Sequence, residues 1–315
     1  MIEEREIAKL SKKFCEECKN RGFQCEVLKV YDIVRMIQKY HPFLVYKTTG
    51  GKMSGKQRKK NKLSNRMLLI IEILCVLIFL YAALQLVSIL QDYYRASKEY
   101  DHLAEVMVVI DEAASSVESD SVIKEEREVP DYYVDLEALK EQNADTIGWI
   151  ILPDSKINYP IVLSKDNTEY LTTTFERKKS SSGAIFVDMY CNGDFSCKNT
   201  IIYGHNMKNG SMFRALNNMT DQEYFDTHHT FCIDTGDGFE YYEVISCYET
   251  VETNLISWKI DFESMESYEN WLESISKRCT YDCADYDVNK NTITLSTCRG
   301  KAGGPGRFIV HLQKK

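Results

Sequence analysis

An unbroken apolar run from Met67 to Leu90 is the feature that most constrains how this chain can fold. It reads MLLIIEILCVLIFLYAALQLVSIL, contains no Gly or Pro, and has Glu72 and Gln85 as its main polar interruptions. A helix needs about twenty apolar residues to cross the hydrocarbon core of a bilayer, and a carboxylate near its end reaches the interface at moderate cost. We therefore predict a transmembrane helix over 67–90, with a buried helix of a soluble protein as the alternative.

The flanking charges predict how this helix is oriented. Seven Lys and Arg residues lie between residues 52 and 66, whereas only Arg95 and Lys98 lie in the twenty residues after the run. By the positive-inside rule, the N-terminus is cytoplasmic and everything after Leu90 is extracellular. The run starts too far from the N-terminus to be a cleaved signal peptide. We expect a single-pass protein that stays attached to the cell membrane.

The rest of the chain divides into four regions by composition. Residues 1–46 carry apolar residues at helical spacing, which is typical of a small helical cytoplasmic region. Residues 47–66 form a basic linker, and residues 91–130 are polar and acidic, as expected of an extracytoplasmic stalk with some helix near the bilayer. Globular patterning resumes near Tyr132, so we expect one globular domain over residues 131–315.

Two groups of residues resemble metal ligands only weakly. Three cysteines near the N-terminus suggest a metal knuckle, but zinc usually takes four ligands and only His41 stands nearby, so free thiols are the preferred interpretation. These cysteines are Cys15, Cys18 and Cys25. A second acidic group, more simply a polar hairpin turn than a calcium site, comprises Asp234, Asp237 and Glu240. We expect no metal and no cofactor.

Seven further cysteines lie between Cys191 and Cys298. An odd number in one compartment leaves at least one thiol unpaired. Cys191 with Cys197, or Cys279 with Cys283, are the pairs near in sequence, but proximity does not establish the geometry that a disulfide needs. We expect mostly unpaired thiols, because a domain of this size has enough core without disulfides.

Beyond residue 131, short apolar runs alternate with turn residues. Eight runs of strand length are separated by Gly, Pro, Asn and Asp, and this pattern predicts a β-barrel or a β-sandwich. They are Ile147–Leu152, Ile157–Leu163, Ala184–Val187, Thr200–Tyr203, Thr230–Ile233, Tyr241–Cys247, Thr292–Ser296 and Phe308–Leu312.

One strongly helical stretch, Asp261 to Arg278, stands between the sixth and seventh runs. Its apolar residues recur every three or four positions, so one face can cover the wall of the sheet. That face comprises Phe262, Met265, Tyr268, Trp271, Leu272 and Ile275. A helix lying on the membrane surface is the alternative.

The segment ITLSTCRGKAGGPGR, from Ile293 to Arg307, is the most informative for chemistry. It places Cys298 at the end of a predicted strand, just before a Gly-rich loop, where a rigid element can present a side chain to an open site. A thiolate is a strong nucleophile, and positive charge from Arg299 and Arg307 favours it. Cys298 is therefore a candidate nucleophile, although a lone cysteine is more often a small core residue.

Two further side chains can assist this thiol. His205 follows a predicted buried strand and a Gly turn in IIYGHNM, where an imidazole can give a proton to a leaving amine and accept one from an incoming amine. Arg307 opens the last strand, where its guanidinium can stabilise a developing oxyanion by about 3 kcal/mol. Each residue alone has a plainer interpretation, as a surface histidine and as a strand-end arginine in an ion pair.

The order YGHN, a helix-bearing insertion, TLSTC and a downstream arginine resembles the sortase family, and the details resemble class B. Other matching segments are DTIGWIILPDSKINYPIVL, DNTEYL and SSGAIFVD. The resemblance runs from about Asp131 to the C-terminus. It implies a mainly β fold, a closed eight-stranded barrel with peripheral helices.

The resemblance also implies the site residues. It assigns the catalytic roles to His205, Cys298 and Arg307. The substrate groove carries over to Asn167, Leu171 and Ser296, for which a helix cap, a core leucine and a strand serine are the plainer interpretations.

A membrane-anchored cysteine transpeptidase of a Gram-positive cell surface is the implied function. Through a thioester it would cleave the C-terminal sorting signal of secreted proteins, a signal beginning with Asn-Pro or a relative. It would pass these proteins to the amine of a lipid-linked peptidoglycan precursor, for wall anchoring or pilus assembly. A surface cysteine protease acting by hydrolysis and a non-enzymatic membrane receptor are the alternatives. The net charge of −8 argues against a nucleic-acid partner.

Overall fold

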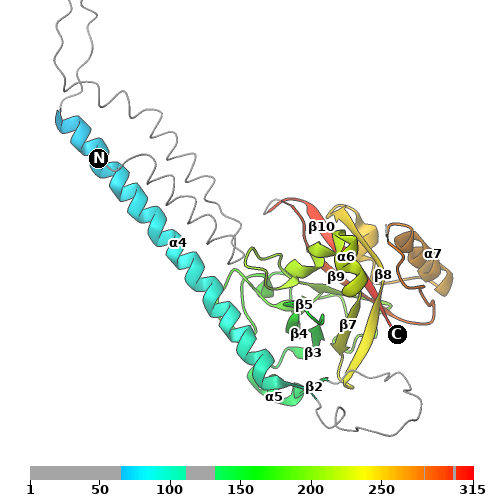
Figure 1. Cartoon of the computed structure of the whole chain (residues 1–315). Helices are drawn as coiled ribbons and strands as arrows, with labels where there is room; N and C mark the ends of the chain where they lie inside the picture. The colour runs from blue at the N-terminus through cyan, green and yellow to red at the C-terminus, as the bar shows by residue number, and fades with distance from the viewer. Residues whose placement is uncertain (1–64, 111–131, 280, 301–302) are drawn as a thin grey trace, which may run out of the picture. The chain divides into compact units, whose positions relative to one another are not determined.

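The computed structural model describes residues 65–110, 132–279, 281–300 and 303–315 (Figure 1). The predicted helical region 1–46, the N-terminal cysteines and nearly all of the basic linker lie outside the described residues.

The apolar run forms the first half of one long helix, α4 (Asn65–Met107). Within the described ranges, α4 is the one helix long and apolar enough to cross a membrane, with a mean hydropathy of 2.7. Large apolar side chains along the run are exposed. Because exposed apolar surface is unfavourable in water and favourable in lipid, these side chains are consistent with a single-pass membrane protein.

The second half of α4 packs against the folded domain. Tyr100 and Leu103 are buried and belong to the same hydrophobic core as the barrel. Residues 91–107, which the composition placed in a stalk, are therefore helical and partly buried. After α4 the chain forms β1 (Val108–Ile110), which pairs antiparallel with β2 (Tyr132–Val134).

Eight strands close into a barrel, and all eight predicted strands are present. They are β3 (Thr146–Ile151), β4 (Asn158–Leu163), β5 (Ile185–Val187), β6 (Asn199–Tyr203), β7 (Thr230–Asp234), β8 (Phe239–Val251), β9 (Thr292–Cys298) and β10 (Gly306–Lys314). The order around the barrel is β10-β8-β7-β3-β4-β5-β6-β9, and β9 pairs with β10 to close it. The pairs β4–β5 and β6–β9 are parallel, and the others are antiparallel. Figure 1 shows β10, in red, beside β8 and β9.

Large rings from different strands fill the barrel. Trp149 of β3, Phe186 of β5, Phe231 of β7 and Phe308 of β10 are fully buried. Burying one such side chain contributes about 1.5–3 kcal/mol. The barrel is therefore a filled core that holds the strand ends rigidly in place.

The helix between β8 and β9, α7 (Met265–Ser276), begins later than the predicted start at residue 261. Ser264 caps it, because its side chain accepts a hydrogen bond from a backbone N–H of the first turn at 3.1 Å. Phe262 packs from outside the helix, and Met265, predicted on the covering face, is 46% exposed. The rest of that face is buried against β8 and β10 as predicted, namely Tyr268, Trp271, Leu272 and Ile275.

Shorter helices occupy the other connections. They are α5 (Leu136–Gln142), η2 (Glu169–Leu171), η3 (Phe213–Thr220), α6 (Gln222–Thr227) and η4 (Leu255–Trp258). The acidic group between β7 and β8 forms a hairpin turn, in which Asp234 accepts hydrogen bonds from the N–H groups of Gly236 and Gly238 at 2.8 and 3.2 Å.

Most of the distal cysteines are unpaired, as predicted. Cys279 and Cys283 form a disulfide. The free thiols of the barrel domain are Cys191, Cys197, Cys232, Cys247 and Cys298.

Candidate active site

Cys298 is the last residue of β9 and lies directly opposite Arg307 on β10. Side chains directly opposed on antiparallel strands have Cβ atoms about 4.5–5.5 Å apart. The thiol and the guanidinium therefore start from neighbouring backbone positions. Cys298 is half-buried, so its sulfur is not sealed in the core.

His205 reaches the same place from β6, because parallel pairing of β6 with β9 sets Tyr203 beside Ser296. A pocket of about 200 Å³ opens where these strands end. Its lining residues are Asn167, Leu171, Phe186, Tyr203, Gly204, His205, Ser296, Thr297, Cys298 and Arg307. All six residues that the sequence singled out are among them.

His205 is held through both its side chain and its backbone. Its Nε2 atom lies 2.8 Å from the carbonyl oxygen of Leu171, and because a carbonyl only accepts hydrogen bonds, Nε2 carries a hydrogen. The backbone carbonyl of His205 accepts a hydrogen bond from Phe213 at 2.9 Å. A Cβ at Gly204 would lie 2.6 Å from the Phe213 ring, so the glycine of YGHN allows this close packing.

Two asparagines fix the backbone of the nucleophile candidate. The side-chain amide of Asn206 donates to the carbonyl of Cys298 at 2.8 Å, and that of Asn217 donates at 3.4 Å. Asn206 belongs to the quoted YGHN motif, but its role was missed. Asn217 lies in η3, and the sequence carried no signal for it because the contact crosses from a distant segment.

The two arginines near Cys298 have different surroundings. Arg307 lines the pocket, and its guanidinium also donates to Glu252 at 2.5 Å and to the Gly304 carbonyl at 2.9 Å. Arg307 therefore forms the ion pair expected of a strand-end arginine and also lines the pocket. Arg299 instead pairs with Glu249 at 2.7 Å and is absent from the pocket lining.

A buried carboxylate holds two residues of the pocket lining. Asp188, 5% exposed, accepts hydrogen bonds from the Asn167 amide at 2.9 Å and from the Tyr203 hydroxyl at 2.8 Å. Burial raises the pKa of Tyr203, and the negative charge of Asp188 raises it further. The hydroxyl therefore stays protonated and donates. Asp188 ends the quoted SSGAIFVD segment, yet its role was not predicted.

The other groove residues differ in exposure. Leu171 is 38% exposed, so it is not a core leucine. Ser296 is buried, and its hydroxyl accepts a hydrogen bond from the indole of Trp258 at 3.3 Å. An apolar side chain at the rim and a tethered hydroxyl inside give the pocket both apolar and polar surface.

Comparison with known proteins decides the family. The model of the sortase domain matches residues 150–315, a range that includes every pocket residue. The chain belongs to the sortase family. Sortase B of Listeria monocytogenes is 35% identical over 178 residues, which cover 56% of this chain and 72% of the relative. Sortase B of Staphylococcus aureus is 31% identical over 180 residues, which cover 56% and 73%.

The solved structures agree with this assignment. The crystal structure of sortase B from Bacillus anthracis in complex with AAEK1 is 33% identical and superposes with a TM-score of 0.58, over 72% of this chain and 99% of that one. The chain is thus a class B sortase, an enzyme of the cysteine transpeptidase type. The predicted closed barrel of eight strands is confirmed.

Proposed function

We propose that this sortase is anchored in the cell membrane by α4, with its N-terminus in the cytoplasm and its barrel outside. It cleaves the C-terminal sorting signal of secreted proteins and joins them to an amine of a lipid-linked peptidoglycan precursor. Anchoring suits this reaction, because the secreted substrate and a lipid-linked acceptor both lie at the membrane surface.

In the first step, the thiolate of Cys298 adds to the scissile carbonyl of the sorting signal. The carbonyl oxygen becomes negative, and Arg307, directly opposite on β10, stabilises it. The carbon–nitrogen bond then breaks, and His205 gives a proton to the departing amine. A thioester on Cys298 remains.

The second step reverses the proton transfer. The acceptor amine attacks the thioester, His205 takes its proton, and the thiolate of Cys298 leaves. One amide bond has replaced another, so the exchange needs no external energy. During both steps Asn167, Leu171 and Ser296 hold the sorting peptide in the groove.

The observation that carries this proposal is the pocket itself. The ends of β6, β9 and β10 bring a half-buried thiol, an imidazole and a guanidinium to the wall of one pocket of about 200 Å³. The Leu171 carbonyl orients the imidazole, and two asparagines hold the Cys298 backbone. Such preorganisation is what a transpeptidase needs before substrate arrives.

Fluorogenic sorting peptides, including a series that begins with Asn-Pro, test the proposal with the full chain in detergent. We expect cleavage that Cys298→Ala abolishes, together with a peptide thioester on Cys298 detected by mass spectrometry. Cys197→Ala, which removes a half-buried thiol outside the pocket, should leave cleavage unchanged. Unchanged cleavage by Cys298→Ala would refute the assignment of the nucleophile.

The acceptor is tested by adding an amine in the same assay. A ligated product that forms at the expense of hydrolysed peptide supports transfer. Hydrolysis alone, at every amine concentration, would instead identify a surface protease.

A further inference from the structure

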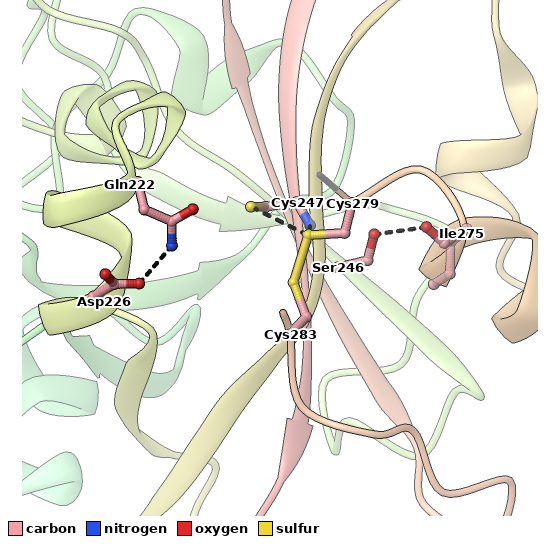
Figure 2. The surroundings of a disulfide bond; sticks show 7 residues. All are labelled: Gln222, Asp226, Ser246, Cys247, Ile275, Cys279 and Cys283. Carbon is pink, nitrogen blue, oxygen red and sulfur yellow. Dashed lines mark hydrogen bonds between the residues drawn. A yellow bond between two sulfur atoms is a disulfide. The ribbon is translucent and has the colours of Figure 1, made fainter. Parts of the chain in front are cut away.

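Three cysteines gather on the barrel wall away from the pocket, where β8 meets the end of α7. Cys247 lies on β8, Cys279 follows α7, and Cys283 lies in the connection to β9. Their three sulfur atoms lie within 4.8 Å of one another. Figure 2 shows Cys279 and Cys283 joined, with a dashed line from the sulfur of Cys247 to the sulfur of Cys279.

The distance between Cys247 and Cys279 fits a shared metal ion. When two thiolates bind one tetrahedral zinc ion, each Zn–S bond is about 2.3 Å long and the two sulfur atoms lie about 3.8 Å apart. The sulfur atoms of Cys247 and Cys279 are 3.9 Å apart. The backbone N–H of Cys247 also points at the Cys279 sulfur, at 3.4 Å. Such a donor stabilises a metal-bound thiolate.

The backbone positions of the two bonded cysteines are far apart for a disulfide. The Cα atoms of Cys279 and Cys283 are 7.1 Å apart, beyond the range of about 4.4–6.8 Å usual for a disulfide. One ion between two thiolates spans a longer distance than a direct bond does. Cys279 and Cys283 are half-buried, so solvent reaches one side of the group, whereas Cys247 is buried.

We propose that Cys247, Cys279 and Cys283 form a binding site for one thiophilic divalent cation of the zinc class. A dithiol reductant supplies two electrons and two protons to the disulfide, and three thiols result. The cation then displaces one proton from each thiol, and a water molecule takes the fourth position, so that the site carries a net charge of −1.

Binding would join three parts of the chain. Beside the cluster, the Ser246 hydroxyl of β8 already donates to the Ile275 carbonyl of α7 at 2.6 Å (Figure 2). A cation would fix the end of α7 and the following connection to the same strand. Because a metal that binds only the folded state stabilises it by mass action, the cation should raise the melting temperature.

The test uses the full chain in detergent with Cys298 and the three N-terminal cysteines replaced. The background carries Cys298→Ala and serine at Cys15, Cys18 and Cys25, and it is reduced and then freed of reductant. Titration with Cd²⁺ should produce the ultraviolet charge-transfer band of a cadmium thiolate, saturating at one equivalent. Zn²⁺ should displace Cd²⁺ and raise the melting temperature by several degrees.

Two substitutions locate the site. Cys247→Ser should weaken Cd²⁺ binding at least about tenfold. Cys283→Ser should have the same effect. Because it alters a half-buried loop position, it is the variant of choice if Cys247→Ser does not fold. Cys191→Ser removes a buried thiol elsewhere and should change neither the band nor the melting shift. No band in the reduced protein, or a band that survives both serine variants, would overturn the proposal.

Discussion

Two arginines follow Cys298 in the sequence, and the fold separates their roles. Arg307 faces the nucleophile across the β9–β10 pair and lines the pocket, whereas Arg299 pairs with Glu249 and the Asn217 side chain. The sequence named both as sources of positive charge but predicted the oxyanion role for Arg307 alone. The strand pairing supplies the physical reason, because it sets Arg307 opposite Cys298.

We expect Arg307→Gln to lower kcat/KM for a sorting peptide by about 100-fold, because losing one donor to an oxyanion costs about 3 kcal/mol. Arg299→Gln is the matched control and should lower it by less than about tenfold, since its ion pair is partly exposed and worth about 1 kcal/mol or less. Equal losses in the two variants would show that general positive charge, rather than placement opposite Cys298, is what matters.

His311 is a second residue whose behaviour depends on the fold. It is fully buried on β10, and its ring nitrogens lie 2.9 Å from the Tyr248 hydroxyl and 2.8 Å from the Thr294 hydroxyl. Burial, and to a lesser extent the charge of Arg278, lower the pKa of His311 from 6.5 to about 3. The folded state therefore keeps this ring neutral where the unfolded state binds a proton.

Stability should consequently fall on acidification. Between pH 6.5 and about 3 the unfolded chain binds one more proton at His311 than the folded chain, so the free energy of unfolding present above pH 6.5 is lost as the pH falls. One group contributes about 1.4 kcal/mol per pH unit within this window. Urea unfolding at pH 6 and pH 5 should show a smaller loss for His311→Gln than for the unchanged protein. Identical pH dependence in both would contradict a neutral buried imidazole.

At the scale of elements, α4 does more than provide an apolar segment. Its buried Tyr100 hydroxyl donates to the Gly183 carbonyl at 2.7 Å and accepts from the Phe175 N–H at 3.1 Å. Gly183 in turn packs closely on the site, because a Cβ there would lie 3.0 Å from the Leu171 carbonyl oxygen and 3.1 Å from the His205 ring. The helix thus supports the loop that orients the imidazole.

Tyr100→Phe should therefore affect both stability and activity. It leaves two buried backbone groups without their partner, which costs about 1–3 kcal/mol, and a shift of Gly183 would disturb the ring of His205. We expect a lower melting temperature and a lower kcat at unchanged peptide specificity. Tyr94→Phe, at an exposed position of the same helix, is the control. Full activity with a lowered melting temperature would limit Tyr100 to a structural role.

For the whole molecule, the proposed orientation is the feature to test. Epitope tags at the two ends of the chain should behave differently on intact protoplasts. An antibody should reach a C-terminal tag directly and an N-terminal tag only after permeabilisation, because the basic residues before α4 favour the cytoplasmic side. The reverse pattern would exclude peptide transfer at the cell surface.

Much of the barrel could be predicted because strands and helices leave a periodic signal in the sequence. The eight apolar runs became β3 to β10, and the helical spacing from Tyr268 to Ile275 became the buried face of α7. The ends of elements were less accurate. The start of α7 depends on the side chain of Ser264, and Met265 is exposed at the first turn.

By itself, the sequence determined the apolar helix and the strand pattern, because local periodicity encodes them, and the resemblance of its spaced motifs to the sortase family pointed to the six pocket residues. Only the tertiary structure decided which distant groups meet: Tyr100 beneath the His205 loop, Asp188 behind the pocket wall, and Cys247 beside Cys279. Such contacts depend on how strands pair and how helices pack around a closed barrel. No single segment carries that information, since each contact joins residues whose separation along the chain is unrelated to their distance in space.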